Sequence, residues 1–227
     1  STQAHLAGPP GASVLPELPE VETIVRRFAP LVAGRRIRSF AATWPRQISP
    51  SIPALRKRII GRRILSLNRR GKHILSHLDD GAALIWHLKM SGRFEWAASC
   101  PDEPGHVRMR LGLSGGHDLL FCDARKFGRL RHEHNPEAAL AHLGPEPLAD
   151  EFTGAQLHAM LSARRRQLKP LLLDQSFLVG LGNIYTDEAL FVSRLHPLRR
   201  SDTLSPAEAS GLFRAIRAVL RRGIAHN

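Results

Sequence analysis

The segment Pro16-Glu17-Leu18-Pro19-Glu20-Val21-Glu22 places two prolines and three carboxylates directly ahead of a helical pattern. Apolar residues then recur at helical spacing and predict a helix of about three turns, the set being Val21, Ile24, Val25, Phe28 and Val32. Pro19 suits the first turn, where a missing N–H is harmless, and the glutamates that follow it complement the positive end of the helix dipole. Taken alone, the segment indicates a helix start with its first two residues on an extended arm.

The region after this helix is expected to be mainly β-structure. Short strand-like runs separated by glycine-rich turns fall at 36–43, 63–68, 73–78, 83–89, 92–96, 107–113, 119–122 and 129–132, with a short helix near 52–60. Many short strands between turns indicate a sandwich or closed barrel rather than a parallel α/β sheet. From Asn135 the pattern becomes helical, with helices expected at 136–143, 154–163, 168–175, 184–192 and 206–222.

These patterns predict an α+β chain with two domains. Residues 16–132 form an N-terminal β-sandwich or barrel domain with a leading helix, 133–147 a turn-rich linker, and 148–227 an all-α domain. Residues 1–15 are small, polar and rich in proline and glycine, so a disordered extension is expected there. This stretch lacks the basic and apolar regions of a secretory signal.

The charge of the chain points to a polyanionic partner. The formal net charge is +13 over 227 residues, and the isoelectric point is near 11.3. Such a field supplies salt-dependent affinity for nucleic acid without sequence preference. Ribosomal and RNA-binding proteins share this composition, so charge leaves the choice of polyanion open.

Cysteine and histidine usage gives no sign of a metal site. Cys100 and Cys122 do not form a CxxC pair, which argues against a disulfide scaffold and against a zinc site within this chain. The histidine pairs His73/His77 and His132/His134 lie in strand-like or loop sequence. No apolar run approaches the roughly 18 residues that a membrane span needs. A cytoplasmic protein without a bound metal is expected.

The leading segment, Pro-Glu-Leu-Pro-Glu-Val-Glu-Thr, resembles the amino terminus of the bacterial formamidopyrimidine-DNA glycosylases, which excise oxidised purines. The resemblance implies that Pro16 is the nucleophile, forming a Schiff base with C1′ of the damaged nucleotide. An α-amine has a pKa near 8, so part of it is unprotonated at neutral pH. The resemblance further implies that Glu17 is the general acid that protonates the opening sugar. Glu20 is either a supporting carboxylate near the amine or a plain first-turn helix residue.

Fifteen residues precede Pro16 in this chain, and its nitrogen is therefore a tertiary amide. An amide nitrogen cannot be the nucleophile. The sequence-based hypothesis is that 1–15 is a mis-assigned start or a removable extension, with synthesis beginning at Leu15.

Three further motifs follow in the family's order. In Arg69-Arg70-Gly71-Lys72, the resemblance implies that Lys72 lies beside the lesion phosphate and assists strand elimination. In His87-Leu88-Lys89-Met90-Ser91-Gly92, it implies that Met90 enters the duplex where the damaged nucleotide has left. In Asp123-Ala124-Arg125-Lys126-Phe127-Gly128, it implies that Phe127 wedges into the gap and Arg125 bonds the orphaned base. Extruding a base costs a few kcal/mol, which such insertions offset in part.

A fourth further motif resembles the family's helix–two-turn–helix. It runs from Lys169 through Gly180-Leu181-Gly182-Asn183 into a helix, and a glycine turn of this kind lets the backbone approach DNA. The helix that follows is expected to offer free N–H groups to a phosphate, with Asn183 as an added donor and Gly182 as the point of approach. Lys169 and Arg164 are expected DNA contacts, Arg164 standing where the family has a lysine.

Two departures from the family pattern stand out. A histidine usual before the strand at 107–113 is replaced by Pro104, although His106 remains as a candidate DNA contact. The chain stops at Asn227, where the family continues into a base-capping loop and a four-cysteine zinc finger. One structural zinc ion is therefore expected only if a full-length protein carries such a finger.

The sequence thus predicts a bifunctional DNA glycosylase and abasic-site lyase acting on oxidised purines. Its partner would be double-stranded DNA with oxidised bases or abasic sites, bound by a monomer in the bacterial cytoplasm at the nucleoid. Two alternatives stay open: an endonuclease VIII-type enzyme for oxidised pyrimidines, and a catalytically inert relative that binds damaged DNA. A generic RNA-binding protein would explain neither the acidic segment nor the Met90, Arg125 and Phe127 set.

Overall fold

The computed structural model describes residues 15–98 and 105–227, and the chain divides into two compact units. Of the described residues, the β-rich unit comprises 15–16, 24–69, 73–98 and 105–139. The helical unit comprises Glu17–Thr23, Arg70–Lys72 and Leu140–Asn227. Of the extension predicted at 1–15, residues 1–14 lie outside the described residues. The predicted domain limits at 132 and 148 stay a prediction.

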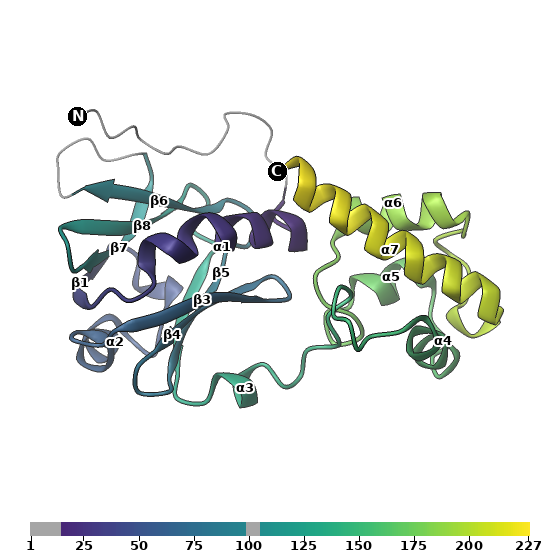
Figure 1. The fold of residues 1–227 in the computed structure, drawn as a ribbon, viewed down its shortest axis with the longest axis horizontal. Helices are drawn as coiled ribbons and strands as arrows, with labels where there is room; N and C mark the ends of the chain where they lie inside the picture. The colour runs from purple at the N-terminus through teal and green to yellow at the C-terminus, as the bar shows by residue number, and fades with distance from the viewer. Residues whose placement is uncertain (1–14, 99–104) are drawn as a thin grey trace. The chain divides into compact units, whose positions relative to one another are not determined.

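Two sheets build the β-rich unit (Figure 1). One has the strand order β1-β7-β8-β6 and the other the order β2-β9-β5-β4-β3. The strands are β1 (Ile37–Ala42), β2 (Ile48–Ser49), β3 (Ile64–Arg70), β4 (His73–Leu78), β5 (Ala83–His87), β6 (Gly92–Ala98), β7 (Val107–Leu113), β8 (His117–Asp123) and β9 (Arg129–Glu133). The helical segments of this unit are η1 (Pro45–Gln47), α2 (Ile52–Ile59) and α3 (Pro136–Ala139).

The two sheets pack face to face through aromatic side chains. Trp86 of β5 contacts Phe94 of β6 edge-on, with ring centroids 5.1 Å apart, and stacks on Phe121 of β8 at 5.8 Å. Such pairs add about 0.5–1.5 kcal/mol each beyond the apolar area that they bury. The β-sandwich predicted from the turn spacing is therefore confirmed.

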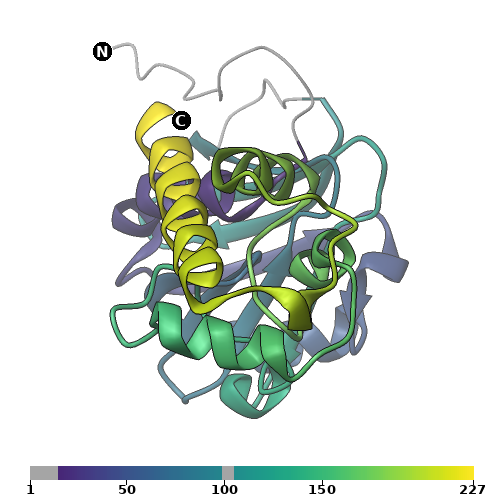
Figure 2. The ribbon, with the colours of Figure 1, turned by 90° about the vertical axis from the view of Figure 1, so that its right-hand side faces the viewer.

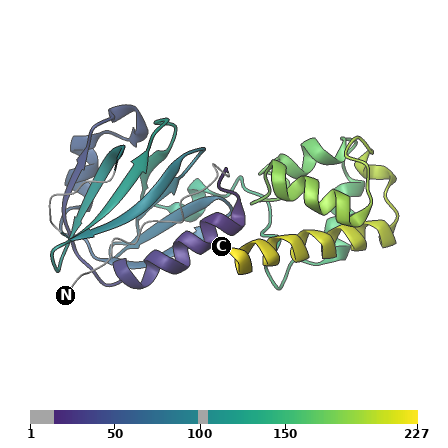
Figure 3. The same ribbon diagram turned by 90° about the horizontal axis from the view of Figure 1, so that it is seen from above.

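Helix α1 (Leu18–Val32) follows the opening segment. Its body lies along the sandwich (Figures 1 and 3), where Phe28 meets Phe94 edge-on at 5.6 Å. Leu18, at the start of the helix, instead belongs to the core of the helical unit, and its N–H donates to the Gly180 carbonyl at 2.9 Å. One amphipathic helix therefore contributes to two separate cores.

The helical unit contains α4 (Gly154–Ser162), α5 (Leu168–Leu173), α6 (Asn183–Ser193), η2 (Ser201–Thr203) and α7 (Pro206–His226). Helix α7 packs along α4 and α6 (Figures 2 and 3). Thr153 and Ser205 begin α4 and α7 with reciprocal capping boxes, which satisfy backbone N–H groups at each helix start. The α+β class and the all-α second part, both predicted from the sequence, are confirmed.

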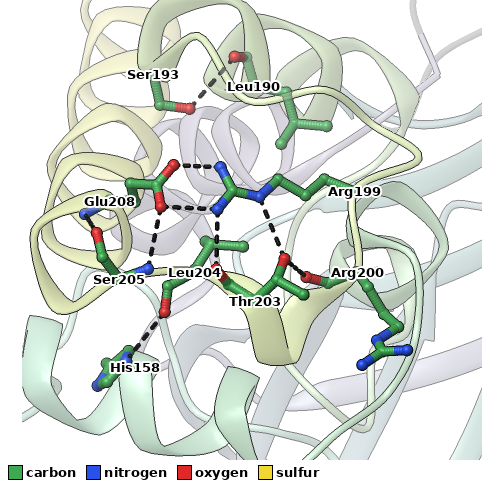
Figure 4. A network of polar contacts seen from close by, with 9 residues as sticks. All are labelled: His158, Leu190, Ser193, Arg199, Arg200, Thr203, Leu204, Ser205 and Glu208. Atoms are coloured by element: carbon green, nitrogen blue, oxygen red, sulfur yellow. Dashed lines mark hydrogen bonds and ion pairs between the residues drawn. The ribbon is translucent and has the colours of Figure 1, made fainter.

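A polar network fixes the start of α7 (Figure 4). Arg199 makes a bidentate contact with Glu208, one of its bonds being Nη2 to Oε1 at 2.8 Å. This contact holds the pKa of Glu208 down at about 2. Glu208 Oε1 also accepts from the Ser205 N–H at 3.1 Å, so one carboxylate serves both the cap and the ion pair.

Among the described residues, no helix is long and apolar enough to cross a membrane.

Candidate active site

The carboxylate of Glu17 lies at the N-terminus of α6. Glu17 is 2% exposed and accepts three backbone N–H groups, from Gly182, from Ile184 at 3.0 Å and from Tyr185 at 3.2 Å. The first amides of a helix form a natural anion site, since they lack partners within the helix and face the positive end of its dipole. Glu17 therefore occupies three of the N–H groups that were expected to be free for a phosphate, while the expected DNA contact at Asn183 stays a prediction.

A glutamine and two glycines shape the turn that presents these amides. Gln175 Nε2 donates to the Leu181 carbonyl at 2.9 Å, and its Oε1 accepts from the Gly180 N–H at 2.8 Å. Gly180 has a φ of 95°, which favours glycine. A Cβ at Gly182 would lie 2.6 Å from Glu17 Cδ, so a side chain there would displace the carboxylate. Both glycines serve the fit of the chain's opening segment against this turn.

Glu20 links Glu17 to α6 through hydrogen bonds. Its Oε2 accepts the Glu17 N–H at 2.9 Å, and its Oε1 accepts the Tyr185 hydroxyl at 2.8 Å. The Glu17 carbonyl accepts from Val21 at 3.1 Å, which places Glu17 at the start of α1. The extended arm expected for this residue is therefore wrong for Glu17, which is anchored through its backbone and its side chain. Pro16, the residue before it, is partly exposed.

Lys72 lies in the turn between β3 and β4 and is electrostatically coupled to both glutamates. Burial lowers the pKa of Lys72, while the charges of Glu17 and Glu20 oppose the shift. Burial likewise raises the pKa of Glu17, opposed by the amide hydrogen bonds and by Lys72. Burial therefore shifts the pKa of each group in the direction of its neutral form, a direction that suits a proton donor at Glu17 and a proton acceptor at Lys72.

The turn that carries Lys72 is fastened by Glu146. Glu146 Oε1 accepts the Gly71 N–H at 2.5 Å and pairs with Arg70 Nη1 at 3.3 Å. Arg70 Nη2 also donates to the Gly144 carbonyl at 2.8 Å. Sequence reasoning placed Glu146 in a linker and missed this role. The available signal was a single acid enclosed by two prolines, in Pro145-Glu146-Pro147.

In the β-rich unit, two loops present the large side chains expected to enter DNA. Met90 and Phe127 are 38% and 44% exposed, so both side chains are open to solvent. The Arg125 guanidinium lies over the Phe127 ring, 5.1 Å from its centroid. Arg125 and Phe127 thus lie side by side, and the cation–π contact restrains the ring.

Asp123 joins these two loops. It is fully buried and accepts from Ser91 Oγ of the Met90 loop, from the Gly128 N–H at 2.8 Å and from Gln47 Nε2 at 2.9 Å. Ser91 Oγ in turn accepts the Arg125 N–H at 3.1 Å. Sequence reasoning quoted Asp123 within a motif without assigning it a role. The available signal was a carboxylate at the end of the apolar strand 119–122. A buried carboxylate must accept hydrogen bonds from its neighbours, so this position could have predicted the contacts of Asp123.

The remaining sequence candidates are His106, Arg164, Lys169 and Asn183. His106 is exposed with a φ of 65°, and its carbonyl accepts the Asp123 N–H at 3.0 Å. Arg164 is exposed, and Asn183 is the exposed first residue of α6. Lys169 Nζ pairs with Asp187 at 2.8 Å, a neighbour that sequence reasoning did not identify. Within residues 15–98 and 105–227, no group of three or more histidine, cysteine or acidic residues could hold a metal ion. Pro104 lies outside the described residues.

The sequence matches two family models, one for each part of the fold. Residues 15–130 match the formamidopyrimidine-DNA glycosylase N-terminal domain, and 143–227 match the formamidopyrimidine-DNA glycosylase H2TH domain. The formamidopyrimidine-DNA glycosylase of Chloroflexus aurantiacus is 44% identical over 213 residues, covering 92% of this chain and 77% of that protein. The enzyme of the same name from Lactiplantibacillus plantarum is 38% identical over 202 residues, covering 87% and 74%.

Solved structures agree with these matches. A complex of MutM with DNA containing carbocyclic 8-oxo-G superposes with a TM-score of 0.87 at 31% identity, covering 92% of this chain and 80% of that one. A complex of the Lactococcus lactis Fpg with DNA containing an abasic site gives a TM-score of 0.85 at 30% identity, covering 92% and 78%. In sequence and in fold alike, the chain belongs to the formamidopyrimidine-DNA glycosylase family.

Proposed function

We propose that this chain is a DNA glycosylase and abasic-site lyase that excises oxidised purines from duplex DNA. The observation that carries the proposal is the buried carboxyl of Glu17, the residue next to Pro16. Three backbone N–H groups of the helical unit donate to this carboxyl, and it interacts electrostatically with Lys72. Burial raises the pKa of this carboxyl. A raised pKa suits a general acid, which must stay protonated until it transfers its proton to the sugar ring oxygen. The relatives solved with DNA containing 8-oxo-G and abasic sites support the substrate class.

The proposed chemistry begins at the Pro16 nitrogen. Its lone pair bonds to C1′, the base leaves with the electrons of the glycosidic bond, and the proton of the amine passes to the departing base. Glu17 delivers a proton to O4′ as the C1′–O4′ bond opens, which leaves an iminium between Pro16 and C1′. Loss of a 2′ proton then expels the 3′ phosphate, and water releases the sugar fragment from the amine. The covalent intermediate divides one difficult displacement into easier steps.

Lys72 would assist at the phosphate during elimination, and Glu20 would hold Glu17 in place. Met90 and Phe127 would fill the gap left by the extruded nucleotide, with Arg125 bonding the orphaned base. His106, Arg164, Lys169 and Asn183 would contact the DNA backbone. The chain would act as a monomer on DNA in the bacterial cytoplasm, and the net charge of +13 would supply binding that weakens as salt rises.

Because Leu15 precedes Pro16, the chemistry requires a polypeptide that begins at Pro16. The test compares the full chain with such a form, each incubated with an 8-oxoguanine duplex and borohydride. We expect a covalent adduct only where Pro16 is the first residue, and Pro16→Gly should reduce it sharply. An equal adduct from the full chain, checked by intact mass to retain Ser1, would refute the imine at Pro16.

The same assay separates the alternatives. Faster release of thymine glycol than of 8-oxoguanine would favour an enzyme for oxidised pyrimidines. Tight binding to damaged duplex without any adduct, at several pH values near neutral, would favour an inert DNA-binding relative.

A further inference from the structure

Tyr185 contacts both acidic residues at the start of α1. Its backbone N–H donates to Glu17 Oε1 at 3.2 Å, and its hydroxyl donates to Glu20 Oε1 at 2.8 Å. The side chain is 7% exposed and packs in the core of the helical unit. Burial raises the pKa of the phenol, and the Glu20 hydrogen bond raises it further, so the hydroxyl remains a proton-bearing donor.

The phenol reaches the chain's reactive end through Glu20. Glu20 Oε2 accepts the N–H of Glu17, and that nitrogen forms the peptide bond to Pro16. The peptide bond is planar, and the pyrrolidine ring restricts the rotation of proline about its N–Cα bond. Once the Glu17 N–H is held, one backbone rotation, the ψ of Pro16, decides where the Pro16 nitrogen points. Tyr185 therefore restrains a carboxylate that restrains the nucleophile.

A glycine in α7 makes room for this phenol. Gly223 lies inside a 21-residue helix, where glycine is unfavourable compared with alanine. A Cβ there would lie 2.7 Å from Tyr185 Cε1 and 2.8 Å from Cζ, and it would also overlap the hydroxyl oxygen. Gly211 in the same helix has no such neighbour, since the nearest atom to its added Cβ would be Arg214 Nη2 at 4.0 Å. The two glycines form a matched pair, one needed by the phenol and one not.

We propose that Tyr185 is a positioning residue, which orients the Pro16 nitrogen by holding Glu20 against the Glu17 amide. The inference rests on the proposed function, because it assigns Tyr185 to the imine chemistry of the same site. This positioning role predicts one specific kinetic result. Because the amine attacks both an intact damaged nucleotide and an abasic site, disturbing the amine must slow both reactions to a similar extent.

The test measures single-turnover rates of Tyr185→Phe on an 8-oxoguanine duplex and on an abasic duplex in the form that begins at Pro16, with the full chain as the control that is expected to form no adduct. A misplacement of about 1 Å costs about 100-fold in rate, and we expect a loss approaching that size on both duplexes, with little change in the dissociation constant for DNA. Gly223→Ala should cause a similar loss, while Gly211→Ala should keep the wild-type rate. The double variant Tyr185→Phe/Gly223→Ala should be little slower than either single variant, because both disturb one contact.

The amplitude of the borohydride-trapped adduct separates positioning from folding. A positioning role lowers the rate at full amplitude, whereas partial unfolding lowers the amplitude at an unchanged rate. A wild-type rate for Tyr185→Phe, or a loss confined to amplitude, would overturn the inference and leave the proposed function intact. If the unsubstituted protein formed no adduct on either duplex in either form, the proposed function would fail, and this inference with it.

Discussion

Replacing Gly182 by alanine tests the Glu17 site without touching a catalytic side chain. The new Cβ would lie 2.6 Å from Glu17 Cδ and 2.9 Å from its Oε1. Carbon atoms in contact normally stay about 3.5–4.0 Å apart, so the carboxyl group must retreat by about 1 Å. The backbone itself would tolerate the change, because Gly182 has an extended conformation with a φ of −121°.

A displacement of about 1 Å costs about 100-fold in rate, equivalent to about 2.7 kcal/mol of activation free energy. The assay is single-turnover excision of 8-oxoguanine by the form that begins at Pro16, with the rate expressed per trapped active site so that unfolded protein is not counted. Gly154→Ala is the matched control, because its added Cβ would make only an ordinary contact with Phe213 Cδ1 at 3.5 Å. A wild-type rate per active site for Gly182→Ala would refute the claim that the amide turn fixes the acid.

Four further predictions follow from the contacts described above. Glu17→Gln should slow excision by about 100-fold or more but slow cleavage of a preformed abasic site less, because an open aldehyde needs no ring opening; equal losses on the two duplexes would contradict the acid role. Since burial raises the pKa of Glu17 above 4.5, the folded protein binds more protons than the unfolded chain between the two values. The wild-type free energy of unfolding should therefore fall relative to Glu17→Gln as pH rises through that interval, measured by urea titration at about pH 4 and about pH 7; a constant difference between the two proteins would exclude the shift. Phe127→Ala should slow excision by about tenfold at unchanged melting temperature, with Leu65→Ala, another exposed apolar residue at 55% against 44%, as control; equal rates for these two variants would contradict the wedge. Asp123→Asn should lower the free energy of unfolding by about 1–3 kcal/mol and slow excision as Phe127→Ala does, since the Asp123 carboxylate accepts hydrogen bonds from both loops. An unchanged urea midpoint would show that these hydrogen bonds do not stabilise the loops.

Local patterns in the sequence predicted the elements of the fold well. The strands His73–Leu78 and Val107–Leu113 were predicted with the observed bounds, because turn residues enclose short apolar runs on both sides. Helix α7 begins at Pro206 as predicted and runs four residues beyond the predicted end at 222. The helix predicted at 136–143 shrinks to Pro136–Ala139. That stretch ends in the turn-rich segment that follows, where helical spacing no longer decides the structure.

The surroundings of the site were harder to predict, because backbone groups supply most of its contacts. Glu17 is bound by amides, which any residue except proline provides, so the sequence carries no mark of the pairing. The same limit applies to Glu146, which reaches the Gly71 amide across 75 residues of chain. Lys169 was predicted as a DNA contact from the motif that resembles the family, and its ion pair with Asp187 forms only when α5 and α6 pack together.

The carboxylate of Glu17 and the amide of Gly182 are separated by 165 positions along the chain. During synthesis on the ribosome, the opening residues emerge long before the turn that receives them has been made. A nascent or prematurely terminated polypeptide that ended ahead of Gly182 would carry the acid but leave it in water, where its pKa would be ordinary. Under the proposed function, the general acid is therefore assembled only after most of the polypeptide has been translated and folded.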